Sequence, residues 1–426
     1  MYKQLRHNEY EKFPFIRIPK DGEKLTKFDG FQYLIMLDRY SLKDTSLETL
    51  KVGDVVVTTI KDDPKFPVVG YGTVKKIDGD TVVVGIDYPE YVDDIDLENL
   101  EKPKSEIVKP LELYWEQIAY RVAKAVAGVE KPEKQEEIFN DFYWLISNQY
   151  YIPGGRILYG AGNPANVTLF NCFSLGTIPD SRSGIMDHIK IATEIMSRGG
   201  GVGSCISSLR PRNAIVKGVN GFSSGSISWA NYLSQLTHLI SQAGTRRGAQ
   251  IIGLHVWHPD VLEFIMCKIQ NPDLLDLLSR HHNPRIAQIA EMYLIRDESG
   301  KPIDVVDKQF MTGANISVLI TDDFMEKVKS GGMWELKYPD LENLSEEQKE
   351  IYDIEWEHMP GLIKEWEKRR LPVKVYEIIP ARDLWDLITT CARYSAEPGV
   401  IFIDRYNKEA NSYYYTNINI TNPCGR

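Results

Sequence analysis

The sequence ends in Thr421-Asn422-Pro423-Cys424-Gly425-Arg426, a segment that places one thiol between a proline and a glycine. Pro423 fixes one backbone angle and lacks an N–H group, while Gly425 can adopt dihedral angles that are closed to other residues. The segment therefore predicts a stiff, narrow loop with the Cys424 thiol at its tip. The same pattern also fits an inert cysteine buried in a turn, so its meaning depends on the rest of the chain.

The composition is that of an ordinary globular protein. The 426 residues are 43% hydrophobic and 26% charged, which predicts two or three domains. The net charge of −10 argues against a broad nucleic-acid-binding surface. The five cysteines form no CxxC pair, so neither a zinc ribbon nor a secreted disulfide framework is predicted. With no apolar signal segment and no membrane-span-like run, the expected location is the cytoplasm.

Three divisions are expected before the main domain. Residues 1–49 form an N-terminal lead that includes a helix. Residues 50–102 hold strands at 55–60, 71–77 and 81–86, with a hairpin turn at Asp78-Gly79-Asp80, and predict a small SH3-like β-barrel. Residues 103–155 form a helical segment, because Ile118, Val122 and Val126 recur at steps of four.

Residues 156–426 alternate between strand and helix patterns, which predicts an α/β domain. The expected strands are 171–175, 250–255, 315–319 and 400–403, and the expected helices are 184–198, 228–242 and one that opens at His258-Pro259-Asp260. The charged stretch 271–308 is interpreted as an irregular insertion. The Glu- and Lys-rich stretch 342–370 is interpreted as a solvated helical face.

Few of these segments indicate chemistry by themselves. The glycine run 199–203 matches neither phosphate-loop pattern, so a tight turn and a close ligand contact are equally probable. Arg246 and Arg247 suit a phosphate or a base edge, but a solvated turn is the plainer interpretation. His255 and His258 lack further ligands at metal-binding spacing, so no metal site is predicted.

Taken in order, seven segments resemble the catalytic subunit of ribonucleotide reductase. They are Asn171-Cys172-Phe173, Gly199-Gly200-Gly201-Val202-Gly203, Gln242-Ala243-Gly244-Thr245-Arg246-Arg247-Gly248-Ala249, His258-Pro259-Asp260, Asn315-Ile316-Ser317-Val318 with Thr321-Asp322, Pro398-Gly399-Val400-Ile401-Phe402-Ile403-Asp404 and Asn422-Pro423-Cys424-Gly425. The stretch 37–44 is similar to the start of the adenosylcobalamin-dependent class. The chain also shows no ATP-cone sequence, which fits that class better than the iron-dependent one.

The resemblance implies a ten-stranded α/β barrel with a finger loop through its centre, of which residues 156–426 are the front part. It implies that Cys172 lies next to Cys424, that Cys424 carries the thiyl radical that abstracts the ribose 3′ hydrogen, and that Asn422 holds a ribose hydroxyl. Cys172 matches one of two reducing thiols. The implied contacts of the substrate, a ribonucleoside diphosphate, are Asn171, Gly200, Gly201 and Arg246.

The resemblance also implies regulation and partners. The implied effector-binding residues, for a deoxynucleoside triphosphate or ATP, are Asp180, Ser181, Arg210, Gln242 and Arg247. The two helices at 184–198 and 228–242 are expected to form a homodimer interface. Thioredoxin or a similar dithiol is the expected reductant, and neither nucleic acid nor membrane is an expected partner.

Two departures leave alternatives open. Arg426 stands where the family has the glutamate that exchanges protons with the substrate, and arginine stays protonated. The second reducing cysteine has no match. We therefore expect the front part of a longer enzyme, inactive by itself. The alternatives are a non-catalytic nucleotide-binding or split-enzyme chain that completes a second polypeptide, and a class I large subunit with a metal-radical partner.

Overall fold

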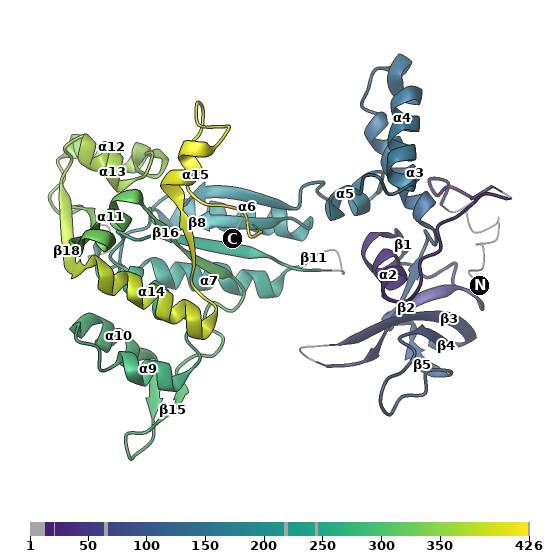
Figure 1. Cartoon of the computed structure of the whole chain (residues 1–426), viewed down its shortest axis with the longest axis horizontal. Coiled ribbons are helices and arrows are strands. Elements are labelled where there is room, and N and C mark those ends of the chain that lie inside the picture. Colours follow the sequence, from purple (N-terminus) through teal and green to yellow (C-terminus); the bar gives the residue numbers. More distant parts are fainter. Residues whose placement is uncertain (1–12, 21, 64–66, 217–219, 243–245, 425–426) are drawn as a thin grey trace. The chain divides into compact units, whose positions relative to one another are not determined.

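The computed structural model describes residues 13–20, 22–63, 67–216, 220–242 and 246–424. The chain forms two compact units, Met1–Asn171 and Cys172–Arg426. The first is purple to blue in Figure 1 and the second is teal to yellow. The predicted boundaries at 49, 102 and 155 remain predictions.

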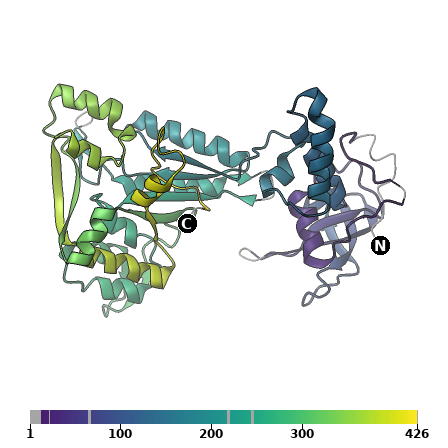
Figure 2. The ribbon, with the colours of Figure 1, turned by 45° about the horizontal axis from the view of Figure 1, so that its top comes forward.

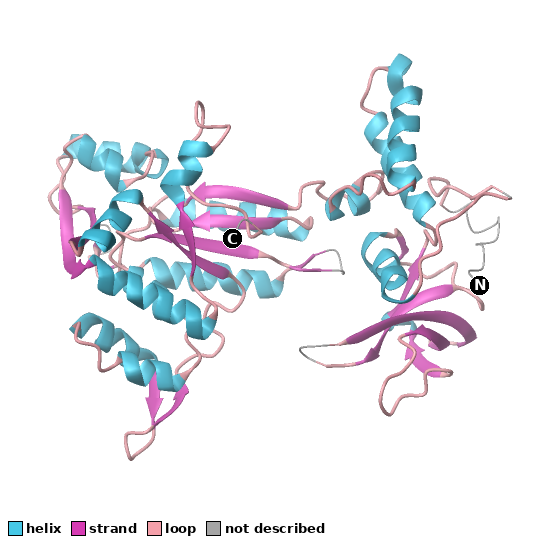
Figure 3. Cartoon of the chain, viewed as in Figure 1, coloured by secondary structure: helices cyan, strands magenta, loops and turns pink. Residues whose placement is uncertain are grey.

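The first unit contains a six-stranded antiparallel sheet (Figure 3), in the order β1-β6-β2-β3-β4-β5. Its strands are β1 (Lys43–Asp44), β2 (Val55–Lys61), β3 (Val68–Asp78), β4 (Thr81–Tyr88), β5 (Leu100–Pro103) and β6 (Ile107–Pro110). Side chains alternate across a strand, so Val55 and Val57 join one apolar cluster and Val56 joins another. The three predicted strands and their hairpin are confirmed, and the SH3-like classification stays a prediction.

Short and long helices complete this unit. They are α2 (Gly30–Ile35), the π-helix Met36–Tyr40, the 3₁₀ turn Lys104–Glu106, α3 (Trp115–Ala127), α4 (Pro132–Ser147) and α5 (Gly155–Gly160). Ile118 and Val122 are buried as their spacing predicts, and Gly128 ends α3. The buried Arg121 Nε donates to Glu112 Oε1 at 2.7 Å, so this unit has a paired charge at its centre.

The second unit is built on a five-stranded parallel sheet in the order β19-β16-β13-β8-β7. The strands are β7 (Cys172–Thr177), β8 (Gly201–Cys205), β13 (Gln250–His255), β16 (Asn315–Ile320) and β19 (Gly399–Phe402). Parallel strands need crossover connections, and the helices supply them: α6 (Arg182–Ser197), α7 (Ser226–Leu239), α8 (Val261–Met266), α11 (Asp322–Ser330) and α14 (Ala381–Ser395). Figures 1 and 2 show α6, α7, α11 and α14 beside the strands.

The two faces of this sheet carry different coverings. Ile252, Leu254 and Val318 belong to the large helix-covered core. Ile251 and Leu319, one residue out of step with them, pack in a separate cluster with Ile420 from the end of the chain. The helices therefore pack on one face, and the C-terminal segment lies on the other.

The two stretches predicted to be irregular or solvated differ from expectation. Residues 271–308 form helices α9 (Pro272–Leu278) and α10 (Pro284–Tyr293) and the hairpin strands β14 (Leu294–Arg296) and β15 (Pro302–Val305). Residues 342–370 are helical, in α12 (Glu346–Glu355), the turn Trp356–His358 and α13 (Ile363–Lys368), but Trp356 and Trp366 are fully buried. Two strands that the sequence analysis did not predict, β17 (Met333–Pro339) and β18 (Val373–Pro380), pair beside them.

The α/β class is confirmed, whereas a closed barrel is not seen in the described part of the chain. The parallel sheet ends at β7 on one side and β19 on the other. Within the described residues, no helix has the length and apolar character needed to span a membrane.

Candidate active site

Two thiols from distant parts of the second unit lie side by side. Cys172 is the first residue of β7, Cys424 lies in a turn, and their Sγ atoms are 3.6 Å apart. Cys172 is half-buried, Cys424 is exposed, and neither is in a disulfide. Since bonded sulfurs lie about 2.05 Å apart, this pair is close enough to react with little movement. The structure thus places together the two thiols that the resemblance implied.

Glycines allow the end of the loop, which comprises residues 413–424, to lie directly on the sheet. A Cβ on Gly203 of β8 would overlap the Thr421 carbonyl oxygen, and one on Gly253 of β13 would overlap Ile420 Cδ1. A Cβ on Gly201 would lie 3.2 Å from both Cys172 Sγ and Pro423 Cγ. Larger side chains at these positions would lift the loop, so the glycines set the depth at which the thiol lies.

The loop is also fastened by burial and by hydrogen bonds. Ser174 Oγ on β7 donates to Ile420 O at 2.8 Å. Ile420 is completely buried, against Cys205 and Ile251 among others. Because β7 and β8 pair in register at Cys172 and Gly201, the sheet that carries one thiol also supports the loop that carries the other.

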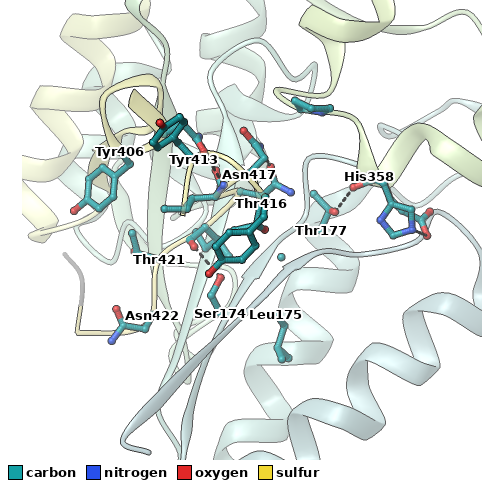
Figure 4. A pocket seen from close by; sticks show the side chains of 18 of the residues that line it. Ser174, Leu175, Thr177, His358, Tyr406, Tyr413, Thr416, Asn417, Thr421 and Asn422 are labelled. Atoms are coloured by element: carbon teal, nitrogen blue, oxygen red, sulfur yellow. Dashed lines mark hydrogen bonds and ion pairs between the residues drawn. The ribbon is translucent and has the colours of Figure 1, made fainter. Parts of the chain in front are cut away.

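A cleft of about 1100 Å³ runs along this loop (Figure 4). Its walls come from residues 174–177, from Glu357 and His358, and from residues 413–422, including Asn422. Thr177 Oγ1 donates to Glu357 O, and burial raises the pKa of the Glu357 carboxyl. Hydroxyl and amide side chains, such as those of Thr177, Asn417 and Asn422, contribute to the lining, and they suit a hydroxyl-bearing ligand.

The predicted substrate-contacting residues do not all lie at the thiol pair. Gly201 lies under the thiol pair, and a Cβ on Gly200 would press against Phe173 and Ile195. Asn171 belongs to the first unit, where its Oδ1 accepts from Arg156 N at 3.1 Å. Arg246 begins the short strand β12 (Arg246–Arg247), and its side chain lies outside the described part of the structure.

The predicted effector residues form a charged cluster at the start of α6. Asp180 accepts from Arg210 Nε at 2.7 Å, from Arg210 N at 3.1 Å and from the Tyr352 hydroxyl at 2.6 Å. Burial raises the pKa of Asp180, although these three donors act in the opposite direction. Ser181 caps α6 by accepting from Gly184 N at 3.0 Å. Asp180 and Arg210 are thus paired with one another.

Two other predicted effector residues lie on a short antiparallel pair. Gln242 ends β11 (Ser241–Gln242) and pairs with Arg246, while Arg247 pairs with Ser241. The side chains of Gln242 and Arg247 lie outside the described part of the structure, as do Gly425 and Arg426. Their predicted roles stay predictions.

The remaining thiols, and the histidines at positions 255 and 258, have the properties of core residues. Cys205, Cys267 and Cys391 are buried, and burial raises the pKa of Cys205 to about 11 and that of Cys391 to about 12. His255 is also buried, which lowers its pKa to about 3. In the described ranges, no group of three or more His, Cys, Asp or Glu residues is arranged to hold a metal ion.

Sequence reasoning did not identify the residues that hold the loop in place. Ser174, Gly253 and Asn407 lie in ordinary strand and helix patterns, and only contacts between distant segments reveal their use. Gly203 belongs to the glycine run 199–203, and its alternation with Gly201 along one strand was the available signal.

Sequence comparisons agree with this geometry. Residues 170–425 match the family model described as ribonucleotide reductase, barrel domain, and residues 108–166 match the one described as ribonucleotide reductase, all-alpha domain. The chain is 29% identical over 286 residues to the vitamin B12-dependent ribonucleoside-diphosphate reductase of Thermoplasma acidophilum, covering 67% of this chain and 28% of that protein.

Two further relatives come from other lineages. A ribonucleoside-diphosphate reductase large subunit of Vaccinia virus is 28% identical over 287 residues, covering 66% of this chain and 31% of that protein. The vitamin B12-dependent ribonucleoside-diphosphate reductase of Mycobacterium tuberculosis is 26% identical over 308 residues, covering 72% and 34%. The matched segment thus spans about a third of the length of these relatives. Because the barrel-domain match alone covers more than half of the sequence, the chain belongs to the ribonucleotide reductase family.

Proposed function

We propose that this chain carries the radical-bearing part of a ribonucleotide reductase catalytic subunit, which converts ribonucleoside diphosphates to 2′-deoxyribonucleotides. The observation that carries the proposal is the 3.6 Å separation of Cys172 Sγ and Cys424 Sγ. Two thiols that meet from an early strand and a late loop are what a reaction combining hydrogen abstraction with thiol reduction requires. Family membership supplies the reaction class.

In this proposal the two thiols have separate tasks. Cys424, at the loop tip, becomes the thiyl radical that removes the ribose 3′ hydrogen. Cys172 supplies one of the two reducing thiols, whose oxidation to a disulfide releases two electrons. Asn422, on the wall of the cleft, offers an amide for a ribose hydroxyl. Among the described residues, the proposal assigns neither the proton-exchanging carboxylate nor the other reducing thiol.

We further propose adenosylcobalamin as the radical source. When bound, this cofactor supplies a cobalt–carbon bond that can break homolytically, and the protein's task is to present a thiol to it. Cys424 fits that task because it is exposed; the neighbouring Asn422 and Pro423 would flank the cofactor's reactive group. Two of the similar proteins carry vitamin B12 dependence in their names. A metal-radical partner subunit is the alternative source.

Effector binding and assembly complete the proposal. A deoxynucleoside triphosphate or ATP would bind near Asp180, Ser181 and Arg210, with Gln242 and Arg247 relaying its identity to Arg246. Helices α6 and α7 would pair in a homodimer. Their half-exposed apolar side chains, such as Ile191 on α6 and Tyr232 on α7, support this. Thioredoxin or a similar dithiol would return the electrons.

The direct test is reduction of a radiolabelled ribonucleoside diphosphate by the complete gene product, with adenosylcobalamin and a dithiol. Cys424→Ser should abolish the reaction, because no radical can form at the loop tip. Cys172→Ser should abolish multiple turnover. Cys391→Ala, which alters a buried thiol on α14, is the matched control and should retain activity.

The outcomes separate the parts of the proposal. Product formed only with a metal-radical partner subunit would reject the cobalamin assignment and retain the reductase. Undiminished activity in Cys424→Ser, or no deoxyribonucleotide with either radical source, would reject the reductase function.

A further inference from the structure

One side chain forms hydrogen bonds to both the N–H and the C=O of a single loop residue. Asn407 lies on α15 (Ile403–Glu409), directly after β19. Its Oδ1 accepts from Ile418 N at 2.7 Å, and its Nδ2 donates to Ile418 O at 2.8 Å. The same Nδ2 donates to Ile403 O at 3.1 Å, one turn earlier in α15. Asn407 therefore ties the helix that follows the last strand to one chosen residue of the loop.

The segment between the helix and that residue is held by local turn hydrogen bonds, from Tyr413 N to Ala410 O and from Tyr415 N and Thr416 N to Ser412 O. Tyr413, Tyr414 and Tyr415 lie between α15 and Ile418, and all three are at least 70% exposed. After Ile418, the chain meets the sheet through Ile420 and the glycines of β8 and β13. Asn407 is thus the first firm attachment that the chain reaches on its way to Cys424.

The other contacts do not by themselves select the register of the loop. Ile418 and Ile420 both pack against the apolar face, and either could fill a similar site if the chain slipped by two residues. Ser174 donates to a single carbonyl oxygen, and every residue has one. Asn407 instead pairs with both the N–H and the C=O of Ile418, so a slip by one residue, which turns these groups to the opposite side of an extended chain, breaks both bonds.

A slip of the loop along the sheet would be large enough to separate the two thiols. One residue of extended chain spans about 3.3 Å, which is comparable with the 3.6 Å that separates Cys172 Sγ from Cys424 Sγ. A shift of one or two residues would carry the Cys424 thiol out of contact with its neighbour.

We propose that Asn407 is the positioning residue that sets the register of residues 417–424 and thereby holds the Cys424 thiol against Cys172. Its importance for catalysis rests on the proposed function, but the positioning itself can be measured without any turnover. Asn407 also lines the cleft, and the positioning role assigned to it here rests on its hydrogen bonds to Ile418.

The test uses the rate at which the two thiols can be joined. Diamide, a diazene oxidant, accepts two electrons and two protons from Cys172 and Cys424, becoming a hydrazine while the sulfurs form a disulfide. The 426-residue chain is treated for timed intervals, quenched by alkylation and digested, and the Cys172–Cys424 peptide is quantified by mass spectrometry. Cys172→Ser and Cys424→Ser define the background.

Two substitutions at Asn407 should slow this cross-link. Asn407→Asp keeps the acceptor for Ile418 N but faces Ile418 O with a second oxygen, and Asn407→Ala removes both contacts. Each should reduce the rate by about 10- to 100-fold, because displacing a reacting group by an ångström or more has effects of this size. Tyr414→Ala, in the same loop, should leave the rate unchanged.

Leu387→Ala supplies the control for lost stability. Leu387 is a buried residue of α14, so its truncation should lower the melting temperature Tm without slowing the cross-link. The Asn407 variants should slow the cross-link more than Leu387→Ala does at an equal loss of Tm.

Three results would overturn the proposal. They are an Asn407 variant that cross-links as fast as the wild type, a rate that falls in Leu387→Ala as it does in Asn407→Ala, and a wild-type chain that forms no Cys172–Cys424 disulfide. If the cross-link depends on Asn407 but the complete protein reduces no nucleotide, the positioning role stands and the proposed function fails.

Discussion

At the scale of single residues, Asp180 depends on its neighbours. Its side chain is 8% exposed and that of Arg210 is 24% exposed, so each needs the other's charge. We expect Arg210→Ala to lower the free energy of unfolding by about 3 kcal/mol, because it leaves a buried carboxylate without its cation. Asp180→Asn in the Arg210→Ala background should restore part of the loss, and urea unfolding of the single and double variants measures it.

This pairing changes how effector binding must be tested. An Arg210→Ala protein that fails to bind a nucleotide could have lost a phosphate ligand or simply the local fold. The Asp180→Asn/Arg210→Ala protein removes both charges together, so its nucleotide affinity should be compared only after its stability has been matched. If the effects of Asp180→Asn and Arg210→Ala on the free energy of unfolding simply add, the two side chains are not coupled.

The five thiols should differ sharply in reactivity. Thiolates are the reacting species, and at pH 8 a thiol with a pKa of about 11 or about 12, as at Cys205 and Cys391, is almost entirely protonated. We expect iodoacetamide to label Cys424 and Cys172 about 100-fold faster or more, since the other three are also buried. Mass spectrometry of timed samples measures the rates. In guanidinium chloride all five should react alike; fast labelling of native Cys205 would refute the assignment.

At the scale of elements, the path of the loop depends on strand β8. Gly203→Ala would place a methyl group where the Thr421 carbonyl oxygen lies, so the loop must lift from the sheet. We expect the variant to keep its helix content by circular dichroism while its Cys172–Cys424 cross-linking rate falls by about tenfold or more. Gly154→Ala, where a Cβ would meet only Asn171 Nδ2 at 3.6 Å, is the matched control. An unchanged cross-linking rate in Gly203→Ala would show that the contact over Gly203 does not set the position of the Cys424 thiol.

Elements with clear periodicity were predictable, and those decided by packing were not. Ile118 and Val122 follow the helical repeat and lie where expected, in α3. The charged stretch around Trp356 and Trp366 was predicted to be solvated because most of its residues are polar. Two buried tryptophans were enough to fix it in the core, since large aromatic side chains dominate burial energy.

The thiol pair was predictable only through the family resemblance, because no local pattern links residues 252 positions apart. The contacts that hold Cys424 next to Cys172 were not predictable at all. Asn407 acts through the main chain of Ile418, and an asparagine that binds a distant main chain leaves no spacing signal in the sequence. The alternation of Gly201 and Gly203 was visible, but both a turn and a ligand contact explained it equally well.

At the scale of the whole molecule, each unit has its own apolar core, and the buried histidines of the second unit should make its stability depend on pH. Burial lowers the pKa of His188 to about 4 and that of His255 to about 3. Between these values and the ordinary 6.5 the unfolded chain binds protons that the folded chain does not, so stability is lost as the pH falls below about 6.5. The loss should reach about 1.4 kcal/mol per pH unit for each histidine.

Calorimetry between pH 7 and pH 5, above the range where most carboxylates titrate, measures this slope. His188→Gln should reduce it, because one of the three buried histidines whose pKa is lowered by burial is gone. A stability that stays constant over this interval would mean that none of these histidines is held neutral by burial.

Apart from the apolar side chains of Ile418 and Ile420, the loop is held by its main chain, and this has a consequence for how such a protein can change over generations. Asn407, Ser174 and Gly203 all meet main-chain atoms of residues 418–421, which any amino acid other than proline provides in full. Substitutions at the exposed tyrosines 413–415 can therefore accumulate without moving the thiol. A single added methyl group under the loop cannot be tolerated in the same way. We therefore expect substitutions to be tolerated at loop residues that contribute only main-chain atoms, and not at the sheet residues beneath them. Distance from the Cys424 sulfur should matter less than this difference.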